Sequence, residues 1–179
     1  MYTDPQWTAL GFVIVDPTLP AGVARQLKLN HRPKDSDLVA LLEKSPPEDE
    51  TMALKWFEIL CDCVSGRPFY LLLFGSVFFY CFVELQLGYL QKLGETPFVP
   101  VESTGYKGDI QRLQPKRCFL GEQPSELYSK LFAFVNFGTC GNKFLEFCGT
   151  KQQPSIEEVA RILLADPGKA YKLANGREK

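Results

Sequence analysis

The sequence has one histidine, almost no net charge and no C-x-x-C cysteine pair, and each of these shortages argues against a class of function. A Ser–His or Cys–His nucleophile pair would have to use His31, which precedes Pro33 in a polar stretch, and a solvated loop histidine is expected there. Twenty basic and twenty-one acidic residues give a net charge of −1. No positive field therefore favours nucleic acid or an anionic membrane surface, and we expect no nucleic-acid partner.

The cysteines do not form a metal-binding pattern. A structural zinc site usually takes ligands from two close pairs such as C-x-x-C, and the sequence has neither pair. Cys61 and Cys63 would point about 200° apart on a helix. Residues 1–4 lack the basic and apolar regions of a secretory signal. We therefore expect reduced thiols, no metal ion and a cytoplasmic location; the cysteines are at positions 61, 63, 81, 118, 140 and 148.

A superficial phosphate-loop pattern lies at residues 137–143, Phe-Gly-Thr-Cys-Gly-Asn-Lys. A nucleotide-binding P-loop needs G-x-x-x-x-G-K-[ST] between a strand and a helix. The glycine spacing differs here, and no serine or threonine follows Lys143. A tight turn between two helices is the favoured interpretation. We expect no enzyme activity and no cofactor, and the sequence predicts no catalytic, cofactor-binding or metal-binding residues.

The composition suits a folded protein, because 45% of the 179 residues are apolar and 13% are aromatic. Helical periodicity is clearest at residues 48–63, where apolar residues recur every three or four positions. Residues 124–138 are expected to form a helix, and Ser155 and Glu158 form a capping box that starts another. Short strands are expected at residues 11–15, 98–101 and 117–120. The predicted fold class is mainly α with a few short β-strands (α+β).

Two stretches of the chain match at a constant offset of 121 residues. Each consists of a helix, a proline, a second helix and a second proline, with Pro33 and Pro46 in one and Pro154 and Pro167 in the other. Either the chain contains a duplicated unit or two ordinary amphipathic helices are each bounded by proline. Because proline cannot donate a backbone hydrogen bond, a duplication predicts matching helix–loop–helix units at residues 21–46 and 142–167.

Residues 68–83 form an uncharged, strongly apolar run of sixteen residues. A membrane-spanning helix needs about twenty residues, so the run is slightly short. Three interpretations stay open: a buried helix, a membrane attachment, or a translated intron at residues 64–83, since Val64 and Ser65 can be encoded by a splice-donor sequence. The predicted organisation is a strand and helical unit at 1–66, an apolar segment and linker helix at 67–93, and short strands with a helical unit at 94–179.

Several short motifs stand out in the second half of the chain. They are Leu-Gly-Glu-Thr-Pro-Phe-Val-Pro-Val at 93–101, Cys-Phe-Leu-Gly at 118–121, Leu-Phe-Ala-Phe-Val-Asn-Phe-Gly at 131–138, and the pairs at 144–145, 148–149, 154–155 and 166–167. With these motifs the chain resembles, over about residues 19–179, a region of large fungal proteins of unknown function that carry a sacsin-like, Hsp90-type ATPase module.

The resemblance implies a piece of a larger protein, located after the ATPase module. That ATPase type uses an asparagine-bearing helix followed by a D-x-G-x-G element, and neither is present; Asp109 is followed by isoleucine without the glycines. The implied function is a non-catalytic scaffold or interaction segment whose partners are other domains of the parent protein or other proteins. The alternative is a small membrane-attached protein that uses residues 68–83.

Overall fold

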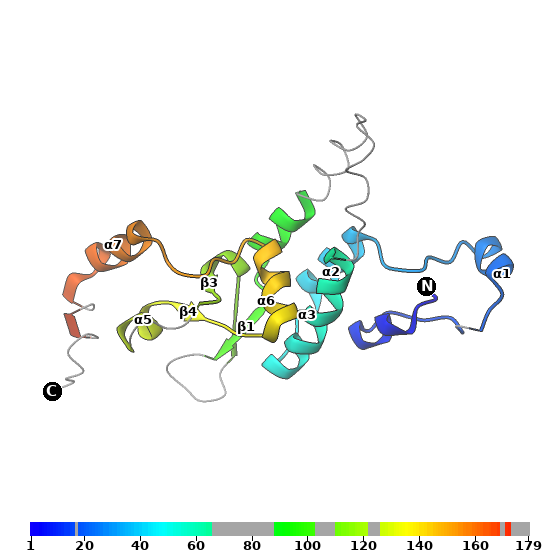
Figure 1. Ribbon diagram of the computed structural model, residues 1–179, viewed down its shortest axis with the longest axis horizontal. Helices are drawn as coiled ribbons and strands as arrows, with labels where there is room; N and C mark the ends of the chain where they lie inside the picture. Colours follow the sequence, from blue (N-terminus) through cyan, green and yellow to red (C-terminus); the bar gives the residue numbers. More distant parts are fainter. Residues whose placement is uncertain (17, 66–87, 103–109, 122–125, 169–170, 173–179) are drawn as a thin grey trace.

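The computed structural model describes residues 1–16, 18–65, 88–102, 110–121, 126–168 and 171–172. The elements form an elongated molecule with α1 towards one end and α7 towards the other (Figure 1). Mainly helical structure with a few short strands confirms the predicted fold class. The helices include η1 (Pro5–Leu10), α1 (Ala21–Gln26), α2 (Asp35–Lys44), α3 (Glu50–Ser65), η3 (Pro115–Arg117), α5 (Glu126–Leu131), α6 (Gly138–Phe147) and α7 (Ile156–Ala165), and residues 88–95 are also helical. The strands are β1 (Val99–Glu102), β2 (Ile110–Leu113), β3 (Cys118–Phe119) and β4 (Ala133–Phe134).

Helix α3 is the central element of the fold, and it confirms the helix predicted at residues 48–63. The Asp49 side chain accepts a hydrogen bond of 2.7 Å from the Met52 backbone N–H, which satisfies one of the unpaired donors at the helix start. The apolar stripe of α3 is buried along its length, at Ala53, Trp56, Phe57 and Leu60. Helix α3 contacts η1, β1 and, most extensively, α6.

Four phenylalanine rings join α3 to the second half of the chain. Phe57 on α3 has no exposed surface, and its ring centroid lies 4.9 Å from that of Phe137, 5.6 Å from that of Phe98 and 5.4 Å from that of Phe144. The first two pairs are edge-to-face, a geometry that adds attraction beyond the burial of area. These rings belong to one core that also includes the buried residues of η1 and α2.

The strands form two small sheets. Strands β1 and β2 pair antiparallel, with Val99 opposite Leu113, and β3 and β4 pair parallel, with Phe119 opposite Phe134. The extended segments predicted at residues 98–101 and 117–120 are thus confirmed.

The strand predicted at residues 11–15 is wrong. Only Ile14 forms a bridge there, to Tyr2, and Val13 is 64% exposed. The backbone turns at Gly11, where φ is +79°, and the Asp16 side chain accepts a hydrogen bond from the Thr18 backbone N–H. These two turns leave too short a segment for a ladder.

The helix predicted at residues 124–138 ends early, at Leu131. Strand β4 follows, because the Val135 backbone N–H donates to the Phe119 carbonyl oxygen at 2.9 Å and the rings of Phe132 and Phe134 contact the ring of Phe119. Residues 137–143 therefore do not form a turn between two helices. They belong to the start of α6, which a strand and a short loop precede.

The apolar run at residues 68–83 lies outside the described residues, as does most of the segment interpreted as a translated intron. Within the described ranges, no helix combines the length and apolar composition needed to cross a bilayer. The three-part division at residues 66–67 and 93–94 stays a prediction.

Candidate functional site

The second helices of the two matching stretches have equivalent starts and ends. Helices α2 and α7 begin and end at positions 121 residues apart. At the start, the Asp37 carboxylate accepts from the Lys34 backbone N–H at 3.2 Å, and the Glu158 carboxylate accepts from the Ser155 backbone N–H at 2.8 Å. At the end, the backbone N–H groups of both C-cap residues donate to the carbonyl oxygen four residues earlier. The predicted helix–loop–helix correspondence is thus present in the backbone hydrogen bonds.

The first helices of the two stretches end in the same way. Helix α1 ends at Gln26, and helix α6 ends at the equivalent residue, Phe147. In both helices the next residue has φ near −80° and ψ of 0°. The residue after that has a positive φ in both stretches, +52° at Lys28 and +92° at Gly149. Helix α6 begins earlier than α1, so only the last part of the two helices corresponds.

The correspondence extends to the pairing of short extended segments. Tyr2 bridges Ile14 and Asn30 in parallel, and Phe119 pairs in parallel with Phe134 and Lys151. Asn30 and Lys151 are 121 residues apart, as are the bounds of η1 and α5. We refer to residues 1–46 as the first unit and residues 118–167 as the second unit. Along the chain, each unit consists of an extended residue, a short helix, a second extended residue, a helix, a third extended residue, another helix and a closing proline. The first extended residue pairs with the other two.

The two units differ in how the third residue of α2 or α7 is bonded to the extended segments. In the first unit, the Tyr2 hydroxyl donates to Asp37 at 2.8 Å; burial, this hydrogen bond and the negative charge of Asp37 raise the pKa of Tyr2 to about 12. In the second unit, the Lys151 ammonium donates to Glu158 at 2.8 Å and holds the pKa of that carboxyl below its usual value. The same position thus has an acidic acceptor in both units.

The two units bury opposite helices. In the first unit, α2 is buried at Leu38, Val39 and Leu42, while α1 buries no residue. In the second unit, α6 is buried at Gly141, Phe144 and Leu145, while α7 buries no residue. The reason is the position of α3, which follows the first unit and packs against α6 of the second (Figure 1).

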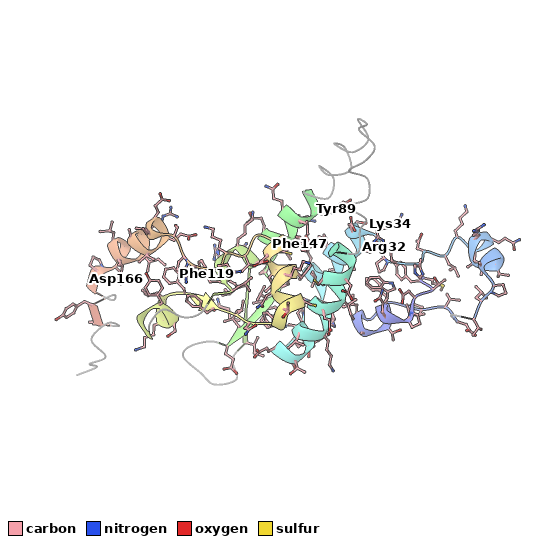
Figure 2. The ribbon with its side chains drawn as sticks, viewed as in Figure 1. Arg32, Lys34, Tyr89, Phe119, Phe147 and Asp166 are labelled. Atoms are coloured by element: carbon pink, nitrogen blue, oxygen red, sulfur yellow. The ribbon has the colours of Figure 1, made fainter. Side chains whose placement is uncertain are left out.

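The uncovered helix of each unit exposes apolar side chains. On α1 and at its end, Val23 is 39% exposed and Leu27 is 59% exposed. On α7, Ile156 is 88% exposed and Leu164 is 77% exposed. Figure 2 marks Asp166 beyond α7, at the opposite end of the molecule from α1. The exposed apolar surfaces of α1 and α7, at the two ends of the molecule, are the candidate interaction sites.

His31 lies in the first unit, whereas the buried thiols of Cys118 and Cys148 lie in the second. The His31 side chain is 80% exposed, in the loop before α2, with a carboxylate oxygen of Asp4 3.9 Å from Nε2. Burial raises the pKa of the Cys118 thiol to about 12 and also raises that of Cys148, so both are held as unreactive thiols. Among the side chains that the structure describes, no three His, Cys, Asp or Glu residues are grouped closely enough to hold a metal ion.

Residues 137–143, which superficially match a phosphate-loop pattern in sequence, have a structural role at the start of α6. The Asn142 side-chain oxygen accepts from the Phe137 backbone N–H at 2.8 Å, and the Asn136 side-chain oxygen accepts from the Gly138 backbone N–H at 3.1 Å. The two asparagine side chains also bond to each other at 3.0 Å. Backbone donors that would face a phosphate in a P-loop are therefore paired with asparagine side chains.

Comparison with known proteins gives a family without an assigned function. No curated protein and no solved structure matches the chain. The family described as protein of unknown function (DUF3684) matches residues 1–179, the whole sequence. The chain therefore belongs to the DUF3684 family.

Proposed function

We propose that this chain is a non-catalytic scaffold or interaction segment of a larger, chaperone-like protein of the sacsin-like, Hsp90-type ATPase kind. The observation that carries the proposal is the stacking of two equivalent units through one shared helix, α3. In repeat architectures each unit covers an apolar face of its neighbour, and the end units are left with faces that need cover. The exposed apolar residues of α1 and α7 are consistent with that arrangement.

The larger protein supplies other domains as partners, and its setting is cytoplasmic. The resemblance of residues 19–179 to the region after an ATPase module supports this placement, together with the near-zero net charge. The buried cysteines Cys118 and Cys148 support a reducing compartment, because neither of them forms a disulfide bond in the structure.

An immunoblot of the native organism tests whether the segment belongs to a larger protein. An antibody raised against the exposed helix α7 should detect a polypeptide far larger than a 179-residue chain. Recombinant chain added to the same extract is the size control. A native band that migrates with the recombinant chain would contradict the proposal.

The chain by itself is expected not to bind nucleotide. A ligand at a hundredfold excess over its Kd stabilises the native state by about 2.7 kcal/mol, which raises the melting temperature of a domain of this size by several degrees. Thermal melts of the purified chain should be unchanged by millimolar Mg-ATP. A reproducible rise, or release of inorganic phosphate above that of a heat-denatured control, would show that the segment has nucleotide machinery of its own.

A further inference from the structure

Comparison of the two equivalent units shows that the first lacks the cover that buries the second. Three positions of the second unit are almost fully buried: Cys118 at 0%, Phe144 at 1% and Cys148 at 1% exposure. Their equivalents in the first unit are Met1 at 71%, Val23 at 39% and Leu27 at 59%. The backbone at the end of α1 matches that at the end of α6, so the difference in exposure between Val23 and Phe144, and between Leu27 and Cys148, comes from what covers each helix.

The cover of the second unit comes from outside that unit. Helix α3 places Phe57 against Phe144, and the segment that leads into β1 adds Phe98, whose ring centroid lies 6.2 Å from that of Phe144. Gly94 in the same segment packs against the Cys148 carbonyl oxygen. The cover thus consists of an amphipathic helix with an aromatic stripe and the extended segment after it.

We propose that the exposed face formed by Met1, Val23 and Leu27 binds an amphipathic helix of the α3 type, presented by another unit of the same repeat. This inference rests on the proposed scaffold function and names the partner of its first unit. The surface is the counterpart of an interface that already exists inside the chain, because α1 in the first unit corresponds to α6 in the second, and α6 is the helix that α3 contacts most extensively.

Charge supports a partner of this kind. The face on α1 is flanked by the exposed basic residues Arg25 and Lys28. Helix α3 carries exposed acidic residues at Glu50, Glu58 and Asp62. A helix with the composition of α3 would therefore bring mostly acidic side chains to a basic rim, which favours its association over that of a basic helix.

A fluorescent peptide of residues 48–62 is a direct probe of this surface. The peptide should bind the full-length chain in a saturable manner, measured by fluorescence anisotropy. The double substitution Val23→Glu and Leu27→Glu should weaken binding by at least about tenfold, because it places charges at the centre of an apolar contact. Both side chains are exposed in the free chain, so the variant should melt at the wild-type temperature.

Two controls separate this surface from other apolar sites. Leu164→Glu, at a residue 77% exposed on α7, should leave peptide binding unchanged. A peptide in which Trp56 and Phe57 are both replaced by alanine should bind at least about tenfold more weakly, since aromatic anchors carry most of the energy of such contacts.

Three outcomes would overturn the proposal. The first is no binding at millimolar peptide, and the second is binding that the Val23→Glu and Leu27→Glu variant retains, which would indicate exchange with the chain's own α3. The third is a dimer of the free chain, detected by light scattering and lost in the same variant, which would assign the face to a second copy. None of these results alters the immunoblot, so failure of this inference is distinguishable from failure of the scaffold function.

Discussion

Replacing Phe57 with alanine is expected to destabilise the whole chain by about 3–5 kcal/mol, the range for removing a fully buried aromatic side chain. Phe57 has no exposed surface and contacts the rings of Phe98, Phe137 and Phe144. Its loss leaves a cavity where α3 meets three aromatic rings of the second half at once. Urea unfolding followed by circular dichroism measures the change.

The size of this effect depends on the two units forming one cooperative structure. Since a domain has a total stability of about 5–15 kcal/mol, the Phe57→Ala variant is expected to lose a large share of it. Leu54→Ala on the same helix is the matched control, because Leu54 is 43% exposed and surface substitutions usually change stability by less than about 0.5 kcal/mol. If Phe57→Ala unfolded only one half, giving two separate transitions, the shared-helix arrangement would be wrong.

Local sequence signals were sufficient for most helices of the fold. The apolar stripe of α3 and the capping box at Ser155 and Glu158 each require only residues three or four positions apart. The equal spacing of the prolines was also visible. These features depend on interactions within one turn or one helix, which is why the sequence predicted them.

The errors came from pairings between residues distant in sequence. Residues 11–15 alternate too little to reveal that only Ile14 pairs with Tyr2, and the helix expected at 124–138 ends early because Val135 pairs with Phe119. The bridges at Tyr2 and Phe119 could not be found from the match at 121 residues. A four-residue difference in the connection that follows each of them breaks the constant offset.

The candidate interaction surfaces were not predictable from the helix pattern alone. Val23 and Phe144 occupy matching positions in matching helices, and one is 39% exposed while the other is 1% exposed. The difference arises from α3, which packs most extensively against α6, the helix that carries Phe144. Amphipathicity identifies a face that needs cover, whereas the structure shows which of two equivalent faces has it.

A glycine-to-alanine substitution is expected to have opposite effects in α6 and in α1. A Cβ atom at Gly141 of α6 would lie 2.6 Å from Cβ of Phe137 and 3.4 Å from Cβ of Phe57. The Cβ atom of Phe137 is attached directly to the backbone, so the N-cap of α6 would have to shift, whereas the approach to Phe57 on α3 is close to an ordinary van der Waals contact. Gly141→Ala is expected to lower the free energy of unfolding by about 1–3 kcal/mol, the range for overpacking, in spite of the better helix propensity of alanine.

Gly22→Ala is the same replacement in the uncovered helix α1, at the position that corresponds to Lys143. A Cβ atom there would meet no other atom within 4 Å. Alanine is favoured over glycine in a helix by about 0.5–1 kcal/mol, so this variant is expected to be more stable than the wild type. Denaturant unfolding of the two variants under the same conditions measures the sign of each change in the free energy of unfolding. Destabilisation by Gly22→Ala equal to that by Gly141→Ala would show that α1 is already covered in the free chain, and would contradict the exposed face on which the docking of an α3-type helix depends.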